Sequence, residues 1–209
     1  LVRDDYDNFT ECQESNKLSK ELWKAMQRFV VWVEVDAELI HAVLVFLAIR
    51  GIGKTKAFLQ SMQRDEQTPE DVLLELMNNF ERKVPAFTSL TKDAQSLVMR
   101  AFDVHRNFNF AQFLQGENSP HHIGVLQTII REEGQRMLRF YLLSLVGVMC
   151  GLRGKETMCG SKFLDQQNGM MLMAGIAMLQ RLEDTSPNGI YWSYIAERAV
   201  ALRLPFDTL

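Results

Sequence analysis

Apolar residues recur at intervals of three and four along most of the chain, which is the spacing of one face of an α-helix. Polar segments with proline, glycine or helix-capping residues separate these stretches. No alternating apolar pattern typical of a β-hairpin is present, so the sequence predicts an all-α fold. The predicted bundle has about eight helices, over residues 16-35, 37-50, 54-64, 69-83, 91-104, 120-150, 161-183 and 187-203.

Several of these helices have clear N-terminal signals. A hydroxyl residue that can cap a helix is followed by proline, which fits the first helical position because its missing N–H needs no partner there. This pair occurs three times, at Thr68-Pro69, Ser119-Pro120 and Ser186-Pro187. Asp36, Thr91 and Ser161 occupy equivalent capping positions at other predicted starts.

Two helices are apolar on nearly every face, in the stretches 137–152 and 169–179. A helix without a polar face must be surrounded by protein or lipid. Both stretches are shorter than the roughly 18–20 residues that span a bilayer, so membrane insertion is not expected. We therefore predict a central apolar hairpin formed by helices 120-150 and 161-183.

Composition favours one folded domain over residues 1-209, with 1-15 as a polar, loosely ordered N-terminal segment. The chain is 47% hydrophobic and 23% charged, and its net charge of −3 gives no general attraction to nucleic acid. The three cysteines, Cys12, Cys150 and Cys159, cannot all pair with one another, which favours reduced thiols in a soluble, intracellular protein. The chain starts at Leu1 with a polar segment and no visible secretory signal, consistent with a fragment of a longer protein.

The segment 47–60 carries the most specific pattern in the chain. Gly51-Ile52-Gly53 follows an apolar helical run, and Lys54, Thr55 and Lys56 begin a basic stretch. With Ala57 four residues after Gly53, this segment resembles the helix-hairpin-helix family, whose Gly-hydrophobic-Gly turn binds nucleic-acid phosphates through backbone amides, although Arg50 stands where that family commonly has proline. The resemblance implies a phosphate site at Arg50, Gly51, Gly53, Lys54, Thr55 and Lys56. The alternative is an ordinary turn between two helices, in which Gly51 ends the first helix.

A second candidate region, 103–133, is rich in possible metal ligands. It contains His105, His121 and His122, together with Asp103, Glu117, Glu132 and Glu133. All-helical hydrolases can hold metal ions with such side chains, but no pair of these histidines has the spacing that places two ligands on one helix face. We therefore assign no metal ligand, no cofactor and no catalytic residue from the sequence.

Two further clusters are assigned to the core. The aromatic cluster and the methionines of helix 161-183 have the spacing of packing residues. They comprise Phe102, Phe108, Phe110 and Phe113, and Met170, Met171, Met173 and Met178. The sequence as a whole predicts a non-enzymatic binding or scaffolding module that engages a protein partner. Nucleic-acid backbone binding and metal-dependent hydrolysis are the alternatives, and no particular oligomeric state is predicted.

Overall fold

The computed structural model describes residues 3–53, 55–61, 68–79, 84–156 and 159–202. Every regular element within these ranges is a helix, which confirms the all-α bundle. The longer helices are α2 (Lys20–Val33), α3 (Ala37–Gly53), α5 (Pro69–Asn79), α7 (Lys92–Asn107), α9 (Pro120–Glu133), α10 (Gln135–Gly151), α11 (Gln166–Leu179) and α12 (Pro187–Leu202). The shorter ones are α1 (Tyr6–Thr10), α4 (Lys56–Ser61), α6 (Pro85–Thr88), α8 (Phe110–Gln115) and the 3₁₀ turn η2 (Gly154–Glu156).

The proline-marked helix starts are confirmed. Helices α5, α9 and α12 begin at Pro69, Pro120 and Pro187. The Thr68 hydroxyl accepts a hydrogen bond from the Asp71 amide at 3.2 Å, and the Ser186 hydroxyl accepts one from the Gly189 amide at 3.1 Å.

The predicted start at Ser161 is wrong. Helix α11 begins at Gln166, and its cap is Asp165, whose carboxylate accepts a hydrogen bond from the Asn168 amide. Ser161 instead lies in the preceding loop, where its hydroxyl donates to the Cys150 carbonyl and accepts from the Leu164 amide. The capping side chain therefore organises a loop turn, which local sequence does not distinguish from a helix start.

The predicted helix 120-150 is two helices in the structure. The break falls at Gly134, whose backbone has φ +85° and ψ 177°, a conformation that essentially only glycine adopts. Arg131 lies in the last turn of α9, and α10 begins at Gln135. The break redirects the chain, so α10 alone is the central apolar helix.

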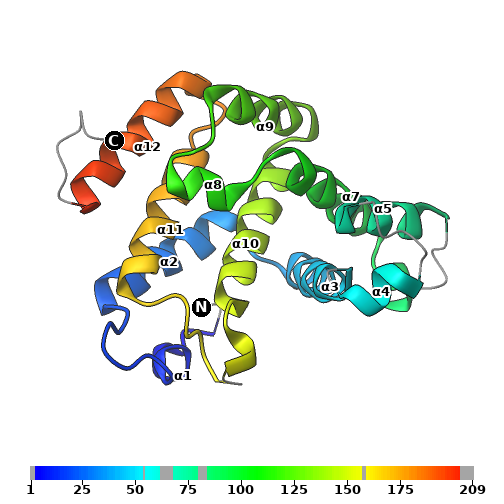
Figure 1. Ribbon diagram of the computed structural model, residues 1–209, viewed down its shortest axis with the longest axis horizontal. Coiled ribbons are helices and arrows are strands. Elements are labelled where there is room, and N and C mark those ends of the chain that lie inside the picture. Colours follow the sequence, from blue (N-terminus) through cyan, green and yellow to red (C-terminus); the bar gives the residue numbers. More distant parts are fainter. Residues whose placement is uncertain (1–2, 54, 62–67, 80–83, 157–158, 203–209) are drawn as a thin grey trace.

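Helix α10 passes through the middle of the molecule, as Figure 1 shows. It packs against α3, α7, α9 and α2, whereas α11 packs mainly against α12, α2 and α8. The two apolar helices therefore share α2 as a neighbour and do not form the main packing unit predicted for the hairpin. Most side chains of α10 are buried, including Leu138, Phe140 and Leu142 at 0% exposure, as an all-round apolar helix requires.

Hydrogen bonds join the described part of the N-terminal segment to the loop before α11. The Gln13 side-chain amide donates to the carbonyls of Ser161 and Leu164, each at 2.7 Å, and its oxygen accepts from the Leu18 amide. The Ser161 amide also donates to the Phe9 carbonyl at 2.9 Å. A buried glutamine that bonds on both sides fixes this segment to the loop before α11.

Candidate functional site

A cavity of about 500 Å³ lies where α3, α5, α7, α8 and α10 meet. Polar side chains line its inner end and its mouth, and apolar side chains from α10 form one wall. The lining residues are Arg50, Glu70, His105, Arg106, Asn107, Phe108, Asn109, Phe110, Ala111, Gln112, Asn118, His122, Leu145, Val148 and Met149. Its size is in the range of small-molecule sites.

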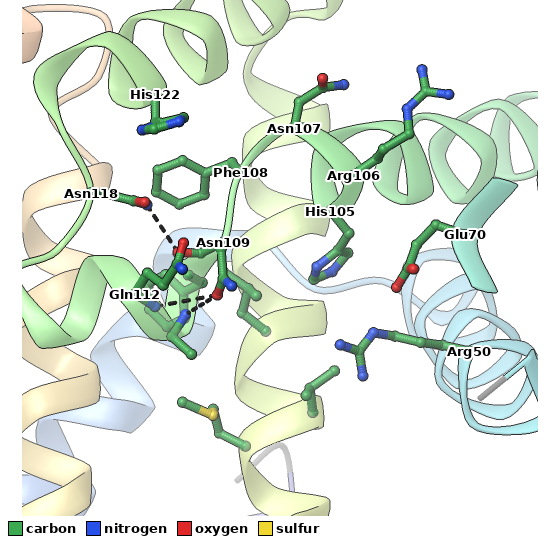
Figure 2. Close-up of a pocket in the computed structure, with 15 residues that line it drawn as sticks. Arg50, Glu70, His105, Arg106, Asn107, Phe108, Asn109, Gln112, Asn118 and His122 are labelled. Carbon is green, nitrogen blue, oxygen red and sulfur yellow. Dashed lines mark hydrogen bonds between the residues drawn. The ribbon is translucent and has the colours of Figure 1, made fainter. Parts of the chain in front are cut away.

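Three charged or polar groups from three helices meet at the inner end of the cavity. Figure 2 shows the Arg50 guanidinium, the Glu70 carboxylate and the His105 ring pointing toward one another. Burial lowers the pKa of Arg50 below its usual value, and the negative charge of Glu70 partly offsets this effect. The guanidinium stays charged at every physiological pH, so α3 places a partly desolvated cation on the cavity wall.

Among the buried polar atoms without a hydrogen-bond partner in the described residues are the Nε of Arg50, which lines the cavity, and the hydroxyl of Tyr141, which does not line it. Tyr141 is fully buried on α10, one helical turn before Leu145 of the cavity wall. Burial raises the pKa of Tyr141, and the charge of Arg50 opposes that rise, which places the phenol close to the guanidinium. Buried polar groups are normally satisfied, so this pair requires an explanation.

The His105 ring fixes the geometry beside these groups. Its centroid lies 5.4 Å from that of Phe46, with the planes 15° apart, and 5.2 Å from that of Tyr141. Phe46 precedes Arg50 by one turn on α3, so both side chains lie on the same face of that helix. Aromatic packing therefore holds the inner end of the cavity in a defined arrangement.

The mouth of the cavity is formed by the loop between α7 and α8 and by the start of α9. Asn109 caps α8 by accepting hydrogen bonds from the amides of Ala111 and Gln112, and the Asn118 side chain donates to the Asn109 carbonyl at 2.9 Å. His122 contacts the Ser119 hydroxyl at 3.1 Å. The side chain of Gln112 has no such structural hydrogen bond among the described residues, which leaves it available to a ligand.

Arg106 at the rim differs from Arg50 because it is paired. It donates to Asp71 at 3.0 Å and to Asp103 at 2.7 Å, and the bond to Asp71 raises its pKa. The pKa of Asp71 is lowered, first by its hydrogen bond with Thr68 and then by Arg106. These contacts tie α5 to α7 across the rim, so the charge of Arg106 is already used within the protein.

Comparison with known proteins places the chain in a family whose function is unknown. One family model matches residues 1–201, and its description is a family of unknown function, DUF6829. The chain belongs to this family. No curated protein and no solved structure matches it. The chemistry of this DUF6829 chain must therefore be argued from its own residues.

The turn predicted at Gly51 is wrong. Helix α3 of the DUF6829 chain continues to Gly53, so the backbone amides of this stretch lie in the last turn of a helix and bond within it. Gly51 does not have a positive φ, and a Cβ added there would meet no atom within 4 Å. Glycine in a helix costs about 1 kcal/mol relative to alanine, and the packing of α3 against α5, α7 and α10 outweighs this.

The described residues of the predicted phosphate site lie in different surroundings. Arg50 lines the cavity, whereas Thr55 and Lys56 are exposed and do not line it. Lys54 lies outside the described residues. Binding of nucleic-acid phosphates by this segment stays an untested prediction. The turn at Gly51 on which that prediction depended is helical in the structure.

The three histidines of the 103–133 region do not converge. His105 lies at the inner end of the cavity, His122 at its mouth, and His121 lines a separate shallow depression beside Pro187. Among the residues that the structure describes, no group of three or more His, Cys, Asp or Glu side chains could hold a metal ion. Hydrolysis remains an untested prediction without an assembled metal site in the described part of the chain.

The aromatic cluster lies in the core, as predicted. The exposed fractions of Phe102, Phe108, Phe110 and Phe113 are 5% or less.

Within the described residues, no helix of this family member has the length and apolar character needed to cross a membrane.

The sequence did not reveal Glu70 or Tyr141 as site residues. Glu70 follows Pro69 in the first turn of α5, where an acid is explained by the helix dipole alone. Tyr141 lies inside an apolar run, where it counts as a core residue. The sequence signal for Tyr141 was its hydroxyl, because the hydroxyl of a buried tyrosine normally has a hydrogen-bond partner.

Proposed function

We propose that this protein is a small-molecule-binding module and that the acid group of its ligand binds at the inner end of the cavity. The supporting observation is the pair of buried, unpartnered atoms, the Arg50 Nε and the Tyr141 hydroxyl. Leaving a buried donor unsatisfied costs about 1–3 kcal/mol for each group. A carboxylate or phosphate oxygen placed between them accepts both hydrogen bonds and neutralises the guanidinium.

The proposal is for binding rather than for catalysis. The described lining of the cavity includes no Ser, Thr or Cys side chain that could act as a nucleophile. The proposal differs from the sequence prediction in its ligand, which is a small molecule bound inside the bundle. Engagement of a protein partner remains a separate prediction that no observation of the described residues tests.

The test is a thermal-shift screen of the full 209-residue chain against small acids: phosphate, acetate, and free and N-acetylated L-amino acids. Sodium chloride at equal ionic strength is the reference, because it screens charge without specific binding. We expect at least one acid to raise the melting temperature of the wild-type protein.

Two variants locate the binding. Arg50→Gln removes the cation of the inner end, and the shift should disappear. Arg106→Gln changes a rim arginine that is already paired with Asp71 and Asp103, and the shift should persist. A screen in which no acid shifts the wild type, or in which Arg50→Gln responds equally, would overturn the proposal.

A further inference from the structure

Glu70 gives the inner end of the cavity a second charge of opposite sign. Its carboxylate points toward Arg50 across the same cavity, and its charge raises the pKa of Arg50 against the effect of burial. Glu70 is in the first turn of α5, where the positive end of the helix favours an ionised carboxylate. The cavity therefore presents a cation and an anion that face each other (Figure 2).

This arrangement discriminates among acids. A ligand with only an acid group is attracted by Arg50 but repelled by Glu70, and both effects are about twice as large for a phosphate dianion as for a carboxylate. A ligand with only a cationic group is attracted by Glu70 but repelled by Arg50. A ligand with both groups a few ångströms apart satisfies both walls, because its amine faces Glu70 while its acid faces Arg50 and Tyr141.

We infer that the cavity takes a zwitterion of the α-amino-acid type, in which a charged amine lies beside a carboxylate. This inference rests on the proposed function, because it assumes that Arg50 binds the acid group. The rest of such a ligand would extend past Leu145 and Met149, which form an apolar wall, toward the amide of Gln112 at the mouth. That path suits a side chain with an apolar stem and a hydrogen-bonding end.

The experiment compares three forms of one compound by calorimetry on the full chain at pH 7. L-glutamine carries both charges, N-acetyl-L-glutamine carries only the acid, and L-glutamine amide carries only the amine; the same series with L-methionine tests the polar end. We expect the free amino acid to bind at least about tenfold more tightly than either derivative. This comparison uses the wild-type protein and so does not depend on any variant folding.

Variants then test whether the amine of the ligand binds Glu70. Glu70→Gln should remove the preference, so that free and N-acetylated forms bind with similar affinity. Glu75→Gln is the matched control, because Glu75 lies on the same helix but does not line the cavity. Melting curves establish that each variant is folded.

The two proposals fail in different ways. If the free and N-acetylated amino acids bind the wild type equally well, the zwitterion inference is wrong and the acid-binding function stands. The same holds if Glu70→Gln keeps the full preference for the free amino acid. If neither the amino-acid series nor any other small acid binds, both proposals are wrong.

Discussion

Arg50 of α3 lines the cavity and Tyr141 of α10 is buried near it, and each has a buried polar atom without a hydrogen-bond partner among the described residues. The two residues are far apart in sequence and are brought together by the packing of α3 on α10. Natural cores rarely leave such groups unsatisfied, and the exceptions concentrate at functional sites. The pair is therefore a feature of this bundle that packing alone does not explain.

Removing the Tyr141 hydroxyl should not harm the ligand-free protein. Tyr141→Phe keeps the ring and deletes a buried group that has no partner, so the free energy of unfolding should stay the same or rise by about 1 kcal/mol. Tyr194→Phe is the matched control. Tyr194 is equally buried, but its hydroxyl donates to the Leu114 carbonyl at 2.7 Å, and its loss should cost about 1 kcal/mol. Urea denaturation measures both, and a Tyr141→Phe loss as large as that of Tyr194→Phe would show that the hydroxyl has a structural partner.

Local sequence predicted the helix starts well because capping is a local interaction. Thr68 and Ser186 each accept a hydrogen bond from an amide three residues ahead, which any chain with that sequence can form. The cavity could not be predicted in the same way. Its inner groups come from four helices, and whether Arg50 meets Tyr141 or solvent depends on how those helices are rotated against one another. Hydrophobic periodicity gives the buried face of a helix but not the residue it meets.

The cysteines should react in an order set by burial. Cys159 is exposed and Cys12 and Cys150 are both half-buried, but burial of its thiol raises the pKa of Cys150 to about 12. Because the thiolate is the reactive form, native protein treated with iodoacetamide at pH 8 should be labelled first at Cys159 and last at Cys150. Peptide mass spectrometry over time gives the three rates, and denaturant should make them similar. Rapid native labelling at Cys150 would contradict its burial beside the apolar wall of α10.

Acid should weaken one surface cluster selectively. The Glu156 carboxylate accepts two hydrogen bonds from Arg153 at 2.7 Å and one contact from Lys162 at 3.1 Å, and these lower its pKa from 4.5 to about 2. A carboxyl with a lowered pKa stabilises the fold above its unfolded pKa and loses that contribution as the pH falls through the folded value. The melting temperature of the wild type should therefore be higher than that of Glu156→Gln near pH 6. The difference should shrink as the pH falls from 4.5 to 2. A difference in melting temperature that does not change over this range would contradict the ion-pair assignment.

Two glycines that both have open space around an added Cβ should respond to alanine in opposite directions. Gly134 has φ +85° at the junction of α9 and α10, where a side chain forces strain of about 1–3 kcal/mol, so Gly134→Ala should lower the free energy of unfolding by that amount. Gly51 lies in the last turn of α3 with open space around its Cα, so Gly51→Ala should raise that free energy by about 0.4–1 kcal/mol through helix propensity and a less flexible unfolded chain. Chemical denaturation of the two variants beside wild type tests both signs at once. If Gly51→Ala instead lowers stability while Gly134→Ala is neutral, the chain turns at Gly51, as the helix-hairpin-helix resemblance first implied, and the end of α3 must be redrawn.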